Sequence, residues 1–261
     1  MSYALWLAAI SAAFVVLERL APRRPDPGAL RPGVLTDAFY VVFNGHFLGL
    51  TLAVITVPAV RAVERAAASL GLASTLHARV AEGLSPLAQF ALAFVLIDLL
   101  KWLIHNLLHR VPALWRFHQV HHSIERMDWL GSMRFHFAEA LIYDGLLYVP
   151  LAVLGFRGEV LFALAVVGTA IGHFNHANLR VRIGPLRYLI NSPEMHIWHH
   201  VHPDAGPPDR NFGINLAVWD WLFGTAYVPD HPPARLGFEG VERYPKNPLG
   251  QALRPMDPRA T

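Results

Sequence analysis

The chain has 261 residues, a formal net charge of +3 and no cysteine; 54% of its residues are hydrophobic and 16% are charged. The lack of cysteine excludes disulfides, thiolate metal sites, iron–sulfur ligation and a cysteine nucleophile. The small charge, carried by arginines that lie beside apolar segments, argues against nucleic-acid binding, and the apolar composition indicates a protein of the lipid bilayer.

Apolar segments recur along the chain at lengths that suit membrane helices. The last two are separated only by the turn 155–158, which predicts a tight helical hairpin. We therefore expect an all-α, integral-membrane helical bundle with about four to five hydrophobic segments. The segments are 3–20, 38–60, 86–104, 138–154 and 159–172.

The connecting segments predict the orientation of this bundle. With the amino terminus outside the cell, residues 21–37, 105–137 and 177–261 fall on one side of the membrane. That side also carries most of the basic residues, which the positive-inside bias assigns to the cytoplasm. The basic residues are Arg110, Arg116, Arg126, Arg134, Arg180, Arg182 and Arg187.

Histidines on this cytoplasmic side are grouped at metal-ligand spacing. Ten of the 15 histidines fall into four short clusters, and the triplet H-x-x-H-H occurs twice. On a helix the triplet places three imidazoles on a single face. The clusters are His105 and His109; His118, His121 and His122; His173 and His176; and His196, His199 and His200. The isolated His46, His77, His202 and His231 are expected to be surface or hydrogen-bonding residues.

Local signals place both triplets on helices. Pro112 can start one helix, and Ser192 followed by Pro193 can cap and start another. Asp98 precedes His105 by two helical turns on the same stripe, inside an apolar segment. It is expected either to accept a hydrogen bond from a ligand histidine or to pair with Lys101.

The number of imidazoles indicates more than one metal ion. Ten exceed what a four- or six-coordinate ion accepts, so we expect two ions with about five protein ligands each. Imidazole suits iron, zinc and copper alike. The chain has none of the motifs Glu-x-x-His, H-E-x-x-H or G-x-S-x-G, which argues against a soluble carboxylate di-iron protein, a zincin and an α/β-hydrolase.

The order and spacing of these clusters resemble a known family. From about residue 86 to residue 228 the chain is similar to the fatty acid hydroxylase/sterol desaturase superfamily of histidine-rich, integral-membrane di-iron oxygenases, and in particular to its bacterial sterol-desaturase-like branch. The residues that carry the resemblance are DLLKWLIHNLLHR (98–110), FHQVHH (117–122), RFHFAE (134–139), HFNHANLR (173–180), NSPEMHIWHH (191–200) and NFGINLAVWDWLFGTAYVP (211–229).

The resemblance implies an enzyme that uses O2 to hydroxylate or desaturate an unactivated C–H bond of a membrane lipid. It implies two Fe ions as cofactor, which Zn could replace in a purified sample, and an external electron donor of the ferredoxin or cytochrome type. The site would face the cytoplasm in a bacterial inner membrane. Residues 1–85 would form the N-terminal transmembrane part, 86–228 the catalytic region and 229–261 a proline-rich tail.

The resemblance also assigns roles to residues. All ten clustered histidines are expected metal ligands, with His173 at a spacing that differs among branches. His136, in the RFHFAE motif, would contact a ligand or stand at the substrate mouth. Residues expected to contact ligands rather than the metal are Asp98, His136, Glu139 and Asn178.

Two other classes of protein remain open. A histidine-ligated zinc-dependent membrane hydrolase would need a general base, for which Glu139, Glu194 and Asp204 are candidates without a recognised spacing. A metal-binding or metal-transport membrane protein would need polar ligands along its spans, whereas these gather at one face.

Overall fold

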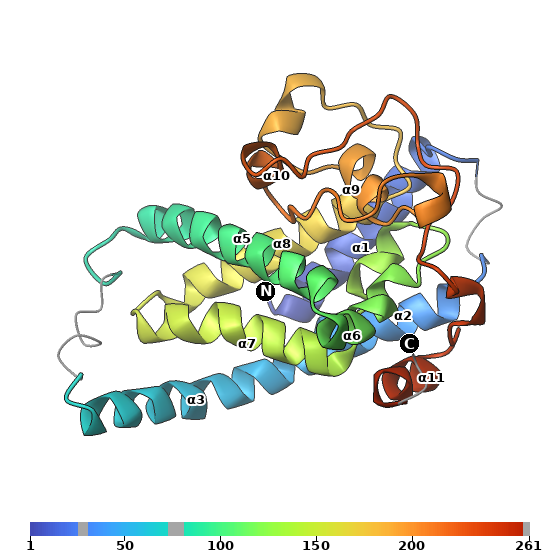
Figure 1. Cartoon of the computed structure of the whole chain (residues 1–261). Helices are drawn as coiled ribbons and strands as arrows, with labels where there is room; N and C mark the ends of the chain where they lie inside the picture. Colours follow the sequence, from blue (N-terminus) through green and yellow to red (C-terminus); the bar gives the residue numbers. More distant parts are fainter. Residues whose placement is uncertain (26–30, 73–80, 258–261) are drawn as a thin grey trace.

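The computed structural model describes residues 1–25, 31–72 and 81–257. All regular secondary structure in this part of the chain is helical, apart from three isolated β-bridges. The expected all-α class is confirmed. The long helices run alongside one another, and the short ones collect at one end of this bundle (Figure 1).

Six long or medium helices build the bundle, and a π-helical turn joins two of them. They correspond to the five apolar segments of the sequence. The last two of these helices are joined by the expected short turn but do not pack closely along each other, so the tight hairpin is not formed. The elements of the bundle are α1 (Tyr3–Leu20), α2 (Val34–Val42), the π-helix η1 (Phe43–Leu48), α3 (Gly49–Ser69), α5 (Pro86–Arg110), α7 (Phe137–Val153) and α8 (Gly158–His176).

Several of these helices are long and apolar enough to cross a bilayer. Helices α1, α5 and α8 meet this condition, and the bent pair Val34–Thr51 and Val54–Ser69 adds a fourth if it forms one span. Helix α7 is also apolar but has 17 residues. By these lengths and this composition the chain is an integral-membrane protein.

The junction between α5 and α6 fixes the first two histidine clusters next to each other. Ser85 caps α5 by accepting a hydrogen bond from the Ala88 N–H, and Pro86 occupies the first turn. Helix α5 ends at Arg110 because Val111, which precedes a proline, is extended. Pro112 then starts α6 (Pro112–His122), as the sequence predicted.

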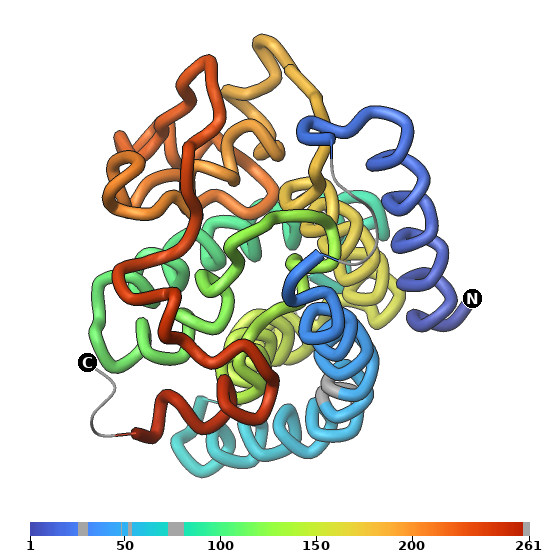
Figure 2. Tube along the Cα trace, turned by 90° about the vertical axis from the view of Figure 1, so that its right-hand side faces the viewer, coloured from blue at the N-terminus to red at the C-terminus, as the bar shows by residue number. Residues whose placement is uncertain are grey.

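Short elements fold over the end of the bundle where α6 lies. Figure 2 looks onto this end, and the C-terminal segment, coloured red, runs across it. The elements are η2 (Trp129–Met133), η3 (Gly184–Tyr188), α9 (Pro193–His199), η4 (Pro203–Ala205), α10 (Val218–Leu222), η5 (Val241–Arg243), α11 (Pro248–Leu253) and η6 (Arg254–Met256).

A buried ionic network joins the N-terminal helices to this cap. The carboxylate of Asp37 on α2 is fully buried and pairs with both Arg31 and Arg134. Arg31 also pairs with Asp128, at the start of η2. Removing one partner of a buried pair typically costs about 3–5 kcal/mol, so these charges hold α2 firmly against the histidine-bearing segments.

Candidate metal centre

Nine of the ten clustered histidines gather into two groups at the cap end of the bundle. Within each group, one ring nitrogen per residue lies within 4.8 Å of all the others. Group 1 consists of His105, His109, His118, His122 and His199, and group 2 of His121, His176, His196 and His200.

Each H-x-x-H-H triplet contributes to both groups. On α6, His118 and His122 join group 1 while His121 joins group 2. Residues i and i+4 lie about 40° apart around a helix, whereas i+3 and i+4 lie about 100° apart, so one triplet can present rings in two directions. Helix α9 divides its triplet in the same way, with His199 in group 1 and the other two in group 2.

The Nε2 atoms converge at the centre of group 1. His105 Nε2 lies 3.1 Å from His118 Nε2, and His122 Nε2 lies 3.0 Å from His199 Nε2. The Nε2 atom of His109 is buried and has no hydrogen-bond partner among the described residues.

Group 2 has the same arrangement. His176 Nε2 lies 3.3 Å from both His121 Nε2 and His196 Nε2, and His200 Nε2 lies 3.2 Å from His196 Nε2. The two groups adjoin, because the rings of His122 and His200 stack with centroids 4.5 Å apart.

Hydrogen bonds at the outer nitrogens orient the group 1 rings. His105 and His199 donate from Nδ1 to the carbonyl oxygens of Phe212 and Arg210, at 2.9 and 2.8 Å. A carbonyl can only accept, so the proton is on Nδ1 and the Nε2 lone pair points inward.

Carboxylates and carbonyls hold four more rings in the same way. His118 Nδ1 lies 2.7 Å from Glu139 Oε1, and His109 Nδ1 lies 2.9 Å from Asp209 Oδ1. In group 2, His121 donates to the Arg134 carbonyl at 3.1 Å and His176 to that of Gly172 at 2.9 Å. His196 Nδ1 and His200 Nδ1 have no partner among the described residues.

This donor set fits a pair of metal ions. Lone pairs that face one another at 3.0–3.3 Å repel unless a cation lies between them. Protons are disfavoured there, because burial and the neighbouring imidazoles lower the pKa of five histidines of the two groups well below the usual range. These are His121, His122, His196, His199 and His200. Clusters of neutral imidazoles suit iron, zinc or copper.

The loop 209–216, which supplies the carbonyls that orient His105 and His199, is held in place by Asp220. Asp220 accepts from the backbone N–H groups of Phe212 and Gly213 and from the indole of Trp102 on α5. Gly213 is required here, since a Cβ atom would lie 2.4 Å from the Leu216 carbonyl oxygen. The ligand orientation therefore depends on a loop that is fastened to a membrane helix.

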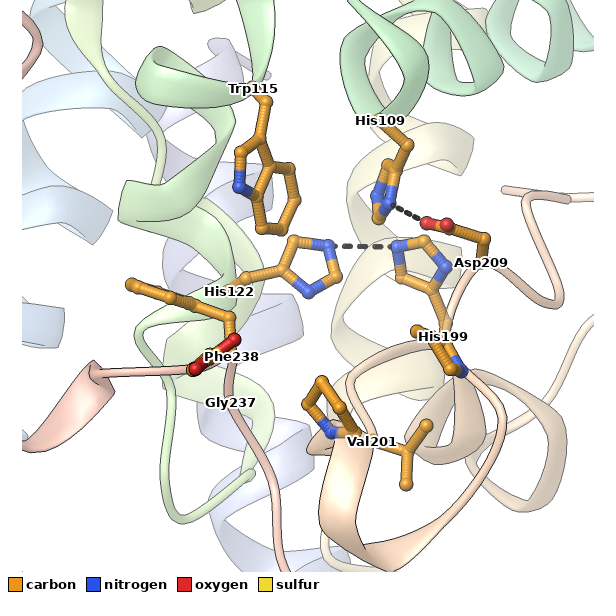
Figure 3. Close-up of a pocket in the computed structure, with 11 residues that line it drawn as sticks. His109, Trp115, His122, His199, Val201, Asp209, Gly237 and Phe238 are labelled. Carbon is orange, nitrogen blue, oxygen red and sulfur yellow. Dashed lines mark hydrogen bonds and ion pairs between the residues drawn. The ribbon is translucent and has the colours of Figure 1, made fainter. Parts of the chain in front are cut away.

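A cavity of about 260 Å³ opens beside group 1. Its wall includes His109, His122 and His199, together with Trp115 and Phe238. Figure 3 shows the facing Nε2 atoms of His122 and His199 and the contact between His109 and Asp209 at the edge of this cavity. A small molecule can reach group 1 here without displacing a protein ligand.

A family comparison agrees with this geometry. The family model described as "Fatty acid hydroxylase" matches residues 90–225, which contain every histidine of both groups. The chain belongs to the fatty acid hydroxylase family.

Curated relatives of this fatty acid hydroxylase family member are named as a lipid hydroxylase, an alkylglycerol monooxygenase and an aldehyde decarbonylase. It is 35% identical over 168 residues to ornithine lipid hydroxylase OlsE of Rhizobium tropici, which covers 64% of this chain and 50% of OlsE. It is 30% identical over 135 residues to human alkylglycerol monooxygenase, 51% of this chain and 29% of that protein. A very-long-chain aldehyde decarbonylase of Oryza sativa is 25% identical over 140 residues, 49% of this chain and 21% of that protein.

The chain therefore matches half the length of OlsE and a smaller share of the other relatives. No solved structure is significantly similar to it.

His173 lies apart from the other predicted ligands. Ser132 Oγ is 2.9 Å from its Nδ1, Ser11 Oγ is 3.2 Å from its Nε2, and its ring packs against Trp129. Both ring nitrogens are thus engaged with hydroxyl groups, and the residue belongs to neither group. The spacing before the last cluster predicted a ligand pair, but only His176 points toward the centre.

Of the residues expected to contact ligands, one does so. Glu139 accepts from His118, as described above. Asp98 instead accepts from the backbone N–H groups of Asn215 and Leu216 and from the Trp219 indole, at 2.9 Å each. The expected contact between Asp98 and a histidine is thereby corrected: this carboxylate fastens the 209–216 loop.

His136 and Asn178 form hydrogen bonds with other partners. His136 caps α7 by accepting from the Ala138 N–H, and its Nε2 donates to the Ala252 carbonyl. Asn178 bonds through its side chain to the backbone of Arg24.

The isolated histidines lie outside both groups, with His77 outside the described residues. His202 is buried and accepts from the Asp204 N–H, His46 is half-buried, and His231 is exposed.

Sequence reasoning missed the loop residues that orient the ligands. Asp209, Gly213 and Asp220 belong to or adjoin the closing motif 211–229, but their roles depend on contacts with distant segments. Asp220, the single acid of LAVWDWLF, and Gly213 before it were the available signal. Nothing in their spacing indicates that the Arg210 and Phe212 carbonyls accept from histidines.

Proposed function

We propose that this protein is a membrane-bound di-iron oxygenase that hydroxylates or desaturates an unactivated C–H bond of a lipid. The observation that carries the proposal is the pair of adjoining, buried, all-imidazole groups at one end of a bundle of membrane helices. The family membership and the names of the relatives support a lipid as the substrate class.

The protein's own residues hold and orient the metal pair and shield it. Nine Nε2 atoms would bind the ions, five in group 1 and four in group 2. Iron bound there would supply the reduction of O2 and the removal of a hydrogen atom from carbon. The rings of Phe135 and Phe212 pack against His121 and His105 and would cover these two imidazoles from water.

Hydroxylation has a fixed stoichiometry: one C–H bond, one O2, two electrons and two protons give one C–OH and one water. Desaturation uses the same oxidant and electrons but removes a second hydrogen and yields two waters. We propose that the electrons come from an external ferredoxin- or cytochrome-type donor.

The proposed location is a bacterial inner membrane with the metal centre on the cytoplasmic side, supported by the arginines of that face. Residues 1–85 would anchor the chain, 86–228 would form the catalytic region, and 229–261 would complete its cap. The family match to residues 90–225 supports the bounds of the catalytic region.

A direct test measures O2 uptake and lipid products in vesicles of a bacterial lipid extract, with reductant and iron-loaded protein. We expect lipid masses increased by one oxygen or decreased by two hydrogens. The variant His121→Ala/His199→Ala should lose both O2 uptake and bound iron, whereas the matched variant His231→Ala, at an exposed histidine outside both groups, should retain them.

The alternatives predict different results in the same assay. A zinc hydrolase would release lipid fragments without O2. A metal carrier would bind and exchange ions with no lipid product. Either result with fully loaded protein would overturn the oxygenase proposal.

A further inference from the structure

An apolar groove of about 510 Å³ lies between α2, α7 and α11, apart from the cavity at group 1. Its size is within the range of about 300–1,000 Å³ that small-molecule sites occupy. We name it the α11 groove. Its lining residues are Phe39, Tyr40, Phe43, His136, Phe137, Asn247, Pro248, Leu249 and Ala252.

Two polar side chains that line the α11 groove, His136 and Asn247, are already hydrogen-bonded within the fold. His136 bonds through both ring nitrogens, to the Ala138 N–H and the Ala252 carbonyl. Asn247 Oδ1 accepts from the Gly250 N–H and so caps α11. The groove therefore fits a hydrocarbon better than a polar headgroup.

The surface around the groove is apolar and exposed. Leu249, Leu253 and Met256 are 71%, 56% and 62% exposed. The spacing of four residues places Leu249 and Leu253 on one face of α11, and Met256 follows in η6. Phe39 on α2 and Phe137 on α7 are exposed beside them. Because α2 continues through η1 into a membrane segment, this apolar surface is continuous with the part of the protein that faces lipid.

One layer of aromatic side chains separates the groove from the metal centre. Phe135, two residues before Phe137, stacks on the group 2 residue His121 with centroids 4.2 Å apart. Phe117, next to His118, meets the ring of His136 edge-on at 4.9 Å. A chain in the groove thus lies against the residues that enclose the proposed reaction site.

We propose that the α11 groove binds the hydrocarbon chain of a membrane lipid, with α11 forming one wall of the groove. Phe39 and Phe43 line it from the membrane-facing helix, and Leu249 and Ala252 from α11. The assignment rests on the proposed function in one respect: the bound hydrocarbon chain is taken to belong to the lipid substrate. Binding of the chain itself requires neither metal nor turnover.

The test uses full-length, iron-loaded protein in phosphatidylcholine vesicles that contain a phospholipid with a diazirine in its acyl chain. After irradiation, mass spectrometry locates the labelled residues. We expect labelling of peptides that contain Phe39 to Phe43 and Pro248 to Ala252, relative to the exposed Leu17 of α1 as an internal reference for general lipid contact.

Two neighbouring substitutions separate the groove from the surface around it. Ala252→Trp fills the groove, whereas Leu253→Trp adds the same indole at an exposed position that does not line it. We expect Ala252→Trp to lower the groove labelling at least tenfold and Leu253→Trp to leave it unchanged. Iron content and the melting temperature identify any variant that fails to fold, and Ala252→Leu then replaces Ala252→Trp as a smaller filling substitution.

Equal labelling in the two variants, or labelling no stronger than at Leu17, would overturn the proposal. So would cross-links between two copies of the chain through this surface, which would make it a protein interface. These results leave the oxygenase proposal intact. Conversely, groove labelling in a protein that yields no oxidised lipid would overturn the oxygenase and retain the site.

Discussion

Glu139 provides the sharpest test of how the protein holds its metal centre. Its carboxylate is 4% exposed and accepts from His118 Nδ1 at 2.7 Å, which fixes the His118 ring with Nε2 toward group 1. Losing such a partner typically weakens metal binding by about 10- to 100-fold, or about 1.4–2.7 kcal/mol. We expect Glu139→Ala to fall in this range.

The amide variant gives a graded result. Glu139→Gln keeps an acceptor oxygen but loses the charge, and charged hydrogen bonds are roughly twice as strong as neutral ones. If Glu139→Gln loses half of the binding free energy that Glu139→Ala loses, its iron affinity falls about three- to tenfold. Anaerobic Fe²⁺ binding at buffered free-ion concentrations measures both variants.

A matched control removes a charge elsewhere. Glu159→Gln changes a side chain that is 72% exposed at the opposite end of α8 from His176 and should leave the iron affinity unchanged. Wild-type affinity in Glu139→Ala would refute the reasoning, because the orientation of His118 would then not depend on this contact.

Four further perturbations test the remaining parts of the site. Gly213→Ala forces a Cβ to within 2.4 Å of the Leu216 carbonyl oxygen, and we expect a loss of about 1–3 kcal/mol in thermal unfolding together with reduced iron content; unchanged values would contradict the packing. Asp98→Asn turns an amide N–H toward at least one of three donors and should lower stability by about 1–3 kcal/mol, seen as a reduced melting temperature at constant iron loading. His176→Gln should reduce the metal stoichiometry measured by elemental analysis, whereas His173→Gln should not; equal losses would place His173 among the ligands. Stripping the metal with a chelator should lower the melting temperature, since a ligand at 1,000 times its Kd stabilises by about 4 kcal/mol; an identical melting curve would mean that the histidine groups hold no ion.

The helical frame could be predicted because its causes are local. Apolar runs of membrane length, Pro112 and Pro193 as helix starts, and the 155–158 turn between α7 and α8 are properties of neighbouring residues. The same holds for the histidine clusters, whose helical spacing alone indicated a metal site.

The division of the ligands between two groups could not be predicted in this way. His121 and His122 are adjacent in sequence but belong to different groups, because each ring meets a different partner helix. His173 has the same one-turn spacing to His176 as His118 has to His121, and it is nevertheless drawn away by Ser11 and Ser132. Such outcomes depend on which distant segment packs against each side of the helix.

The sequence by itself determined an all-helical membrane protein with histidine clusters that could hold metal, since hydrophobic length and helical periodicity act over a few turns. Only the tertiary structure decided which nitrogen of the rings of His105, His109, His118 and His199 faces inward. That choice depends on Glu139, Asp209 and the carbonyls of residues 210 and 212, which approach the rings from up to 107 positions away along the chain. A hydrogen bond requires contact within about 3 Å, and only the complete fold brings those atoms together.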